Sequence, residues 1–247
     1  MEHQIDKPSK LASASITHRL RARLTKQFKL VETRLTLPRS HITYRICQPD
    51  AVDPLLDAAA DDPEQNLPYW AVTWPSGIAL ADVVLTERAR FAGQRVLELG
   101  CGLGITATAA VAAGTRLAVT DYAPEALLLC RLNALANTGR EPYTLQLNWR
   151  RPRPALFKLA QPPFPDVLAA DVLYETRDVN PLLELVERLV APGGILWLAE
   201  PRRAAAQQFL AVAVAHGWRD EVEHHTGPWS ASEDTGAIVN VHRLQRA

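Results

Sequence analysis

A glycine-rich segment that follows an apolar run constrains the fold of this chain more than any other feature. Glycine stands at every second position of Gly100-Cys101-Gly102-Leu103-Gly104, directly after the predicted strand Arg95–Leu99. Because glycine adopts positive φ and has no Cβ, the backbone there can approach a ligand closely. An alanine-rich helix is expected over Gly104–Ala113. The next strand, Leu117–Thr120, ends at Asp121, a carboxylate suited to accept both hydroxyls of a ribose. This succession predicts a nucleoside cofactor in a doubly wound sheet.

Two nucleoside cofactors are compatible with this succession. Residues 102–107 can be aligned with the GxGxxA dinucleotide fingerprint, which indicates NAD. However, the glycines alternate, and Glu98 lies in the strand two residues before the first of them. This E-x-G-x-G-x-G pattern resembles motif I of the class I S-adenosylmethionine methyltransferases. A tight turn that merely needs small residues is the structural alternative.

The resemblance to motif I implies a role for each residue of the pattern. In that family the loop, here Gly100, Gly102 and Gly104, lies against the methionine part of S-adenosylmethionine. The acid in the strand, here Glu98, helps to hold the amino-acid end of the cofactor, directly or through water. The carboxylate after the next strand, here Asp121, binds the ribose.

Composition narrows the class of protein. The chain has 247 residues, of which 47% are hydrophobic and 22% charged, as in one soluble globular protein. Its formal net charge is zero, so no global basic field indicates nucleic-acid binding. No apolar run approaches the ~20 residues of a membrane span. The three cysteines form no metal-ligand pattern, which predicts no metal site and suits a reducing cytoplasm.

The N-terminal segment is the one region with a skewed charge. Residues 1–34 contain eight Lys or Arg and three acids, a net charge of +5, without the apolar core of a secretory signal. A mitochondrial-type transit segment is one interpretation of it. An amphipathic helix is the favoured one, because apolar residues recur at helical spacing, at Leu20, Leu24, Phe28 and Val31.

Strand and helix patterns alternate from about residue 94, which predicts a parallel sheet covered on both faces. Further strands are expected at Tyr143–Leu147, Asp166–Ala170 and Ile195–Ala199. Further helices are expected at Pro124–Asn137, Val179–Leu189 and Arg203–His216. Residues 191–194 are expected to form a turn before the fifth strand. Two late segments, Arg219–His225 and Ala237–Arg243, predict a hairpin with one antiparallel strand, which resembles the class I methyltransferase sheet.

The expected fold is therefore Rossmann-like: a doubly wound, mostly parallel seven-stranded sheet with a C-terminal antiparallel hairpin. Residues 1–66 are expected to form an N-terminal extension with a basic helix and short β segments, Thr33–Leu37 and His41–Cys47. Residues 67–247 are expected to form the methyltransferase domain. A helix is expected to begin near Ser76, as a possible N-cap, after the aromatic segment Leu67–Trp74.

That aromatic segment narrows the resemblance from the class I methyltransferases in general to one subgroup of them. The pattern Pro-Tyr-Trp-Ala-x-x-Trp-Pro-x-Gly-x-Ala-Leu before motif I resembles the seven-β-strand protein lysine methyltransferases, often grouped as methyltransferase family 16. The chain is most similar to the branch that modifies the β subunit of electron transfer flavoprotein. The similarity covers about Leu67 to Arg203 and includes Asn133, Trp149, the segment Ala170–Tyr174 and the segment Glu200–Arg203.

On the acceptor side, Asp171 and Tyr174 are the expected catalytic residues. Asp171 follows a strand, so its carboxylate faces the crevice and can anchor a lysine ammonium. Tyr174 offers a hydroxyl and a cation–π face. The alternative is a purely structural role, in which Asp171 caps a turn and Tyr174 belongs to the core. Arg202 and Arg203, which depart from the Asp-Pro-Gly-Arg pattern of the branch, are expected only to solvate a helix start.

On the cofactor side, Trp74 is expected to pack close to S-adenosylmethionine. Asn148-Trp149 stands where relatives often have Asp-Trp, with the first side chain facing the adenine amino group. An amide oxygen can still accept that hydrogen bond.

The leading hypothesis is a methyltransferase that acts on a protein lysine with S-adenosylmethionine as its cofactor. The alternatives are a small-molecule N-methyltransferase, an NAD-dependent oxidoreductase, and a non-catalytic module that keeps the cofactor fold and binds a partner. No nucleic-acid or membrane partner is expected. The sequence leaves the acceptor and the oligomeric state open.

Overall fold

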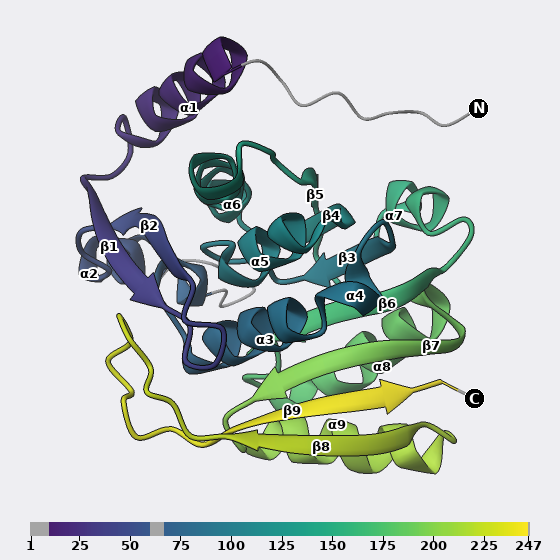
Figure 1. The fold of residues 1–247 in the computed structure, drawn as a ribbon. Coiled ribbons are helices and arrows are strands. Elements are labelled where there is room, and N and C mark those ends of the chain that lie inside the picture. Colours follow the sequence, from purple (N-terminus) through teal and green to yellow (C-terminus); the bar gives the residue numbers. More distant parts are fainter. Residues whose placement is uncertain (1–9, 60–66, 247) are drawn as a thin grey trace, which may run out of the picture.

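A seven-stranded sheet forms the centre of the structure, which is a computed structural model that describes residues 10–59 and 67–246 (Figure 1). The strand order is β5-β4-β3-β6-β7-β9-β8. The bounds of these strands are β3 Arg95–Leu99, β4 Arg116–Asp121, β5 Tyr143–Gln146, β6 Phe164–Ala170, β7 Val190–Glu200, β8 Arg219–His225 and β9 Val239–Gln245.

Strand direction follows the predicted pattern. The pairs β3–β4, β3–β6, β4–β5 and β6–β7 are parallel, and β9 runs antiparallel to both of its neighbours, β7 and β8. The predicted doubly wound sheet with a C-terminal hairpin is therefore confirmed. Its parallel strands end at one edge, where the glycine loop and Asp121 also lie.

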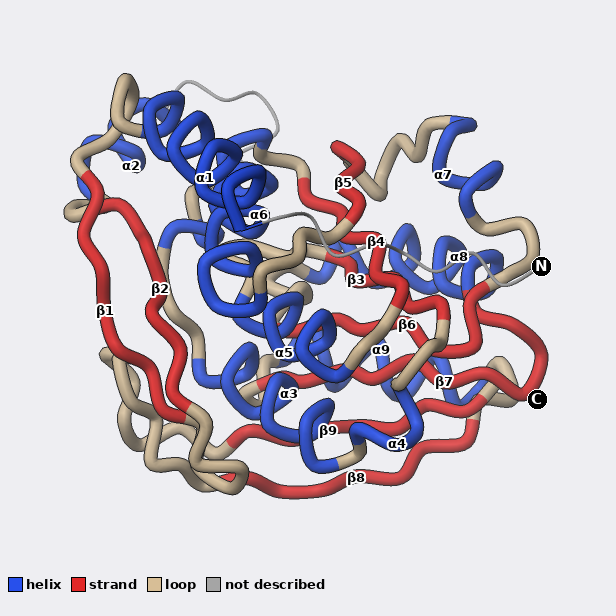
Figure 2. Tube along the Cα trace, turned by 45° about the horizontal axis from the view of Figure 1, so that its top comes forward, coloured by secondary structure: helices blue, strands red, loops and turns tan. Residues whose placement is uncertain are grey.

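Helices cover both faces of the sheet (Figure 2). One layer contains α3 (Pro75–Thr86), α5 (Ile105–Ala113) and α6 (Pro124–Thr138), which contribute to one apolar cluster. The opposite layer contains α8 (Val179–Leu189) and α9 (Ala204–Ala215), which contribute to a second cluster. Two short helices, α4 (Arg88–Phe91) and α7 (Pro154–Leu159), complete the fold. No described helix has both the length and the apolar character needed to cross a bilayer.

The N-terminal extension packs against this domain. Helix α1 (Lys10–Leu24) lies beside α6, and β1 (Leu30–Thr36) pairs antiparallel with β2 (Thr43–Pro49), followed by α2 (Asp53–Ala59). Buried apolar side chains join it to the core on the α3, α5 and α6 side: Leu20, Leu24, Leu35 and Leu37. The extension and the domain thus share one apolar cluster.

Three local expectations need correction. The first helix ends at Leu24, so Phe28 and Val31 lie outside it; Val31 pairs with Gln48 in the hairpin, because strand pairing there replaces the helical pattern. Helix α3 begins at Pro75 with Trp74 as its N-cap residue, so Ser76 lies inside the helix. Residues 191–194 belong to β7 and form an irregularity in its pairing with β6, not a separate turn.

Candidate functional site

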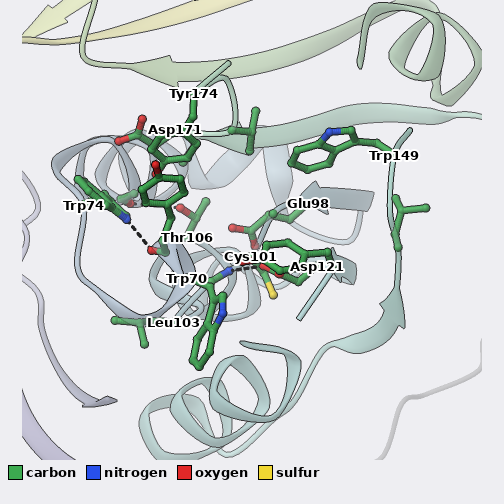
Figure 3. A pocket seen from close by; sticks show the side chains of 18 of the residues that line it. Trp70, Trp74, Glu98, Cys101, Leu103, Thr106, Asp121, Trp149, Asp171 and Tyr174 are labelled. Atoms are coloured by element: carbon green, nitrogen blue, oxygen red, sulfur yellow. Dashed lines mark hydrogen bonds between the residues drawn. The ribbon is translucent and has the colours of Figure 1, made fainter. Parts of the chain in front are cut away.

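One pocket lies at the carboxyl ends of β3, β4 and β6 (Figure 3). The structure brings all ten predicted site residues together in its lining: Trp74, Glu98, Gly100, Gly102, Gly104, Asp121, Asn148, Trp149, Asp171 and Tyr174. The lining also contains Tyr69 and Trp70, which belong to the aromatic segment Leu67–Trp74. Asp178, another lining residue, was not singled out from the sequence.

The glycine loop forms part of the pocket wall, and two of its glycines, Gly100 and Gly104, cannot be replaced without displacing neighbours. Gly100, Gly102 and Gly104 all have positive φ, at 69°, 48° and 78°. A Cβ on Gly104 would lie 2.6 Å from the Cα of Cys130 in α6, a contact that no side-chain rotation could relieve. A Cβ on Gly100 would lie 2.9 Å from Cγ1 of Val172. Glycine is therefore required at these two positions by positive φ and by close packing against α6 and Val172.

Asn133 fixes this loop from behind. Its side-chain N–H groups donate to the backbone oxygens of Leu103 (2.8 Å) and Cys47 (2.9 Å), and its oxygen accepts the N–H of Cys47 at 2.8 Å. Asn133 is 1% exposed, so these bonds are shielded from water. A residue noted only through the family resemblance thus connects β2 of the extension to the glycine loop.

Asp121 closes the loop from the end of β4. One carboxylate oxygen accepts the N–H of Gly102 at 2.9 Å, and the other accepts the N–H of Ala123 at 3.0 Å. Burial raises the pKa of Asp121 to about 6, although these backbone N–H groups lower it. The carboxylate is held in one orientation and retains acceptor capacity toward the pocket.

Glu98 is a buried acid with one carboxyl oxygen that the described residues leave without a partner. Its side chain is 2% exposed, and among the described residues Oε2 has no hydrogen-bond partner. Burial, and secondly the charge of Asp121, raises the pKa of Glu98 well above its ordinary value. A buried carboxylate oxygen without a partner is costly. A ligand ammonium at this position would satisfy it.

Trp149 and Asn148 line the pocket beyond β5. The Trp149 indole N–H lies 3.4 Å from Oδ1 of Asp178, and Arg150 binds both oxygens of that carboxylate, at 2.6 and 3.0 Å. The side-chain oxygen of Asn148 accepts the backbone N–H of Arg150 at 3.0 Å. The Arg150–Asp178 pair, which sequence reasoning missed, fixes the segment that carries the predicted adenine-facing residues.

Asp171 lies at the opposite end of the pocket, after β6. Its backbone is in the left-handed region, with φ at 53°, which is uncommon for a residue with a side chain. The Nε–H of Arg203 donates to Oδ1 at 2.7 Å, and the Ser76 hydroxyl lies 3.5 Å from Oδ2. Burial raises the pKa of Asp171, and the Arg203 hydrogen bond and charge oppose that rise. Strained backbone of this kind gathers at functional sites.

An aromatic cluster surrounds this carboxylate. Tyr174 stacks on Tyr69 with ring centroids 4.0 Å apart and planes 8° apart, and the Trp74 ring meets Tyr174 edge-on at 6.0 Å. The Trp74 indole N–H donates to the Tyr69 backbone oxygen at 2.7 Å. Burial raises the pKa of Tyr174 well above its ordinary value, so its hydroxyl stays protonated.

Arg203 corrects an expectation from the sequence. Rather than only solvating the start of α9, its guanidinium pairs with Asp171 and lies 4.5 Å from the ring centroid of Tyr174 and 5.6 Å from that of Trp74. The sequence could not indicate this contact, because 32 residues separate Arg203 from Asp171.

The pocket lining is mainly acidic. Among its lining residues are five carboxylates and one arginine, namely Glu98, Asp121, Asp171, Glu175, Asp178 and Arg150. Arg203, Arg177 and Arg150 pair with Asp171, Glu175 and Asp178, whereas Glu98 and Asp121 have no cationic partner among the described residues. Such a lining attracts cationic ligand groups and opposes a pyrophosphate.

Comparison with known proteins agrees with this geometry. Residues 64–215, more than half of the chain, match a family described as lysine methyltransferase. The histone-arginine methyltransferase METTL23 of Xenopus laevis is 30% identical over 57% of this chain and 61% of its own length. The electron transfer flavoprotein beta subunit lysine methyltransferase of Danio rerio is 42% identical over 28% of each chain. The matched region thus spans less than two thirds of either relative.

Solved structures share the fold. An O-methyltransferase from Bacillus cereus in complex with SAH aligns with a TM-score of 0.51 and 15% identity, over 78% of this chain and 90% of that one. At this identity the likeness concerns the arrangement of strands and helices alone.

Proposed function

This chain belongs to the lysine methyltransferase family, and from that premise we propose that it transfers a methyl group from S-adenosylmethionine to the ε-amine of a protein lysine. The observation that carries the proposal is the acidic pocket, in which Glu98 and Asp121 beside the glycine loop have no cationic partner among the described residues. Both the sulfonium donor and a lysine ammonium are cationic, whereas NAD carries a pyrophosphate. The charge of the lining therefore favours methyl transfer over hydride transfer.

The residues at one end of the pocket fit the cofactor. The loop of Gly100, Gly102 and Gly104 would lie against its methionine part, and the unpartnered oxygen of Glu98 would accept its ammonium group. Asp121 would accept the ribose hydroxyls. When bound, S-adenosylmethionine supplies an electrophilic methyl group on a positively charged sulfur.

The adenine of the cofactor would lie against the part of the pocket that Trp149 and Asn148 line. Trp149 provides an apolar face, and Asn148 would contact the exocyclic amine. Trp74 lines the same pocket and contacts Tyr174 at the acceptor end. The Arg150–Asp178 ion pair would keep Trp149 and Asn148 in place when the cofactor leaves.

At the acceptor end, Asp171 and Tyr174 act on the nucleophile. An unperturbed lysine has a pKa of about 10.4, so the amine must be held and lose a proton before it attacks. The Asp171 carboxylate would hold the ammonium and orient it, and the ring of Tyr174 would stabilise its charge. The proton leaves to solvent, and alignment of the amine supplies much of the rate.

Several finer assignments belong to the same proposal. Residues 67–247 form the methyltransferase domain and residues 1–66 an extension, which accords with the family match beginning at residue 64. The protein acts on a protein substrate rather than on a small amine. A reducing cytoplasmic location suits its three buried free cysteines, Cys47, Cys101 and Cys130.

The test is methyl transfer from tritiated S-adenosylmethionine into a cell lysate that is separated by size, with the labelled residue identified by mass spectrometry. We expect label on lysine in the protein fraction. We expect Asp171→Ala to bind S-adenosylhomocysteine as the unmodified protein does and to lose methyl transfer by about 100-fold or more.

Three results would contradict this proposal. Label only in the small-molecule fraction would indicate a metabolite acceptor, and label on arginine would overturn the lysine assignment. Unchanged turnover by Asp171→Ala would remove Asp171 from the mechanism.

A further inference from the structure

We propose that Arg203 is a positioning residue, which holds Asp171 ionised and in one orientation from outside the pocket. This inference rests on the proposed function, because it assigns to Asp171 the binding of the substrate ammonium. Asp171 lines the pocket, whereas Arg203 is absent from the described lining residues. Arg203 therefore acts on the substrate through Asp171 rather than by direct contact.

The two oxygens of Asp171 are bound unequally. Oδ1 accepts the Nε–H of Arg203 at 2.7 Å, a short charge-assisted hydrogen bond. Among the described residues, Oδ2 has only the Ser76 hydroxyl at 3.5 Å, the outer limit of a hydrogen bond. One oxygen is thus fixed by the protein, and the other retains acceptor capacity for an ammonium group.

Arg203 is itself held on both its side chain and its backbone. The guanidinium lies over Tyr174 and Trp74, and the backbone N–H donates to Oε2 of Glu200 at 3.0 Å. An arginine bound by an ion pair and two aromatic faces has little freedom to move. It can therefore transmit a fixed position to Asp171.

Glu200 connects this pair to the C-terminal hairpin. Its Oε1 accepts the amide N–H of Asn240 at 2.8 Å and lies 3.4 Å from Nε2 of His242. Nδ1 of His242 in turn lies 2.9 Å from a carboxylate oxygen of Asp220 in β8. Polar contacts therefore run from β8 through β9 and β7 to Arg203 and the pocket.

Electrostatics give Arg203 a specific task. Asp171 is 6% exposed, and burial alone favours its neutral form. The charged or titratable groups that face it are Arg203, Glu200 and Tyr174. Of these, Arg203 favours the ionised carboxylate, and Glu200 opposes it. Without Arg203 the carboxyl would protonate at higher pH and could no longer bind an ammonium.

The variants Arg203→Gln and Arg203→Lys test this role, and Arg202→Gln is the matched control, because Arg202 is the exposed neighbour of Arg203. The first measurement is the titration of the Asp171 carboxyl by ¹³C NMR, which needs no substrate. We expect Arg203→Gln to raise the pKa of Asp171 by about one pH unit or more. We expect Arg203→Lys to restore most of that difference and Arg202→Gln to leave the titration unchanged.

The second measurement is the initial rate of tritium transfer to the protein fraction of a cell lysate across the pH range. We expect Arg203→Gln to lose about 100-fold in rate and to shift the acid limb of the profile upward. S-adenosylhomocysteine should bind within about twofold of the unmodified protein, which also reports that the variant is folded. Arg203→Lys should recover part of the rate and most of the acid limb.

Three results would overturn the inference. These are an unchanged Asp171 titration in Arg203→Gln, a rate equal to or above that of the unmodified protein, and loss of S-adenosylhomocysteine binding. A higher rate would mean that Arg203 competes with the substrate cation. If the unmodified protein labelled no protein at all, the proposed function would fail, while the NMR titration would still test the hold of Arg203 on Asp171.

Discussion

The two ends of the pocket handle buried negative charge in different ways. At the cofactor end, Asp121 accepts backbone N–H groups, and Oε2 of Glu98 has no partner among the described residues. At the acceptor end, Asp171 is paired with Arg203. The cofactor end thus leaves carboxyl oxygens for a ligand to bind, whereas the acceptor end pairs its carboxylate with a protein cation.

This difference indicates what each end has to do. A cofactor that stays bound through the reaction can itself supply the cation and hydroxyls that Glu98 and Asp121 need. A substrate side chain arrives and leaves, so Asp171 must keep its charge and orientation between turnovers. A permanent arginine provides that, at the cost of weakening the attraction for the incoming ammonium.

The largest expected effect comes from a substitution in the glycine loop, at the cofactor end of the pocket. Gly104→Ala would place a Cβ 2.6 Å from the Cα of Cys130 at a residue with φ at 78°. We expect the free energy of unfolding to fall by about 4 kcal/mol and the affinity for S-adenosylhomocysteine to fall by about 100-fold or more. Chemical denaturation and calorimetry measure these two quantities.

Gly139→Ala is the control for this variant. Gly139 also has positive φ, at 72°, but a Cβ there would meet nothing within 4 Å. It should cost about 1 kcal/mol and leave cofactor affinity unchanged. Equal effects of the two substitutions would mean that backbone strain, rather than crowding against α6, explains the requirement for glycine in the loop.

A second, smaller effect is a pH dependence of stability that arises from His242, which contacts Glu200 behind the acceptor end. Burial lowers the pKa of His242, but hydrogen bonds and charge from Asp220 and Glu200 outweigh it and raise the pKa to about 9. Because the pKa of His242 is higher in the folded than in the unfolded protein, the protonated imidazole stabilises the fold. This contribution is complete below the unfolded pKa, near 6.5, and is lost as the pH rises through 9. We expect unfolding to become easier by about 3 kcal/mol over that range.

Urea denaturation at intervals from pH 6 to pH 10 measures this dependence. His242→Gln should flatten the curve, because it removes the titrating imidazole that Asp220 and Glu200 hold protonated. A slope that persists in His242→Gln would assign the pH dependence to other groups.

The smallest expected effect is a gain in stability from a substitution at Arg202, next to the acceptor end. Arg202 precedes Arg203 with φ at 64° and an exposed side chain. Arg202→Gly should relieve that backbone and raise the free energy of unfolding by about 1 kcal/mol, without loss of methyl transfer. Arg202→Ala retains the same backbone requirement and should give no such gain. A loss of stability in Arg202→Gly would mean that the Arg202 side chain makes a stabilising contact.

The cofactor end was predictable from the sequence, because its parts are close together along the chain. Glu98, the glycine loop and Asp121 lie within one strand–helix–strand unit whose geometry is set by local rules. The alternating pattern also predicted the parallel strands, and the two late segments predicted the antiparallel hairpin. Whether each of these residues binds the cofactor stays a prediction.

The acceptor end was only half predictable. Asp171 and Tyr174 were found through the family resemblance, but the Arg203 contact and the stacking of Tyr69 depend on long-range packing. The first helix was also predicted too long. Its apolar spacing continues to Val31, yet the pairing of β1 with β2 determines the structure there.

Calorimetry with S-adenosylhomocysteine and with NADH, each titrated into the protein at pH 7.5, tests the central claim most directly. That claim is that the carboxyl groups beside the glycine loop select a phosphate-free nucleoside that carries an ammonium group. We expect S-adenosylhomocysteine, whose ammonium group can reach Glu98, to bind with micromolar affinity, and NADH to give no measurable heat. Tighter binding of NADH would contradict the account.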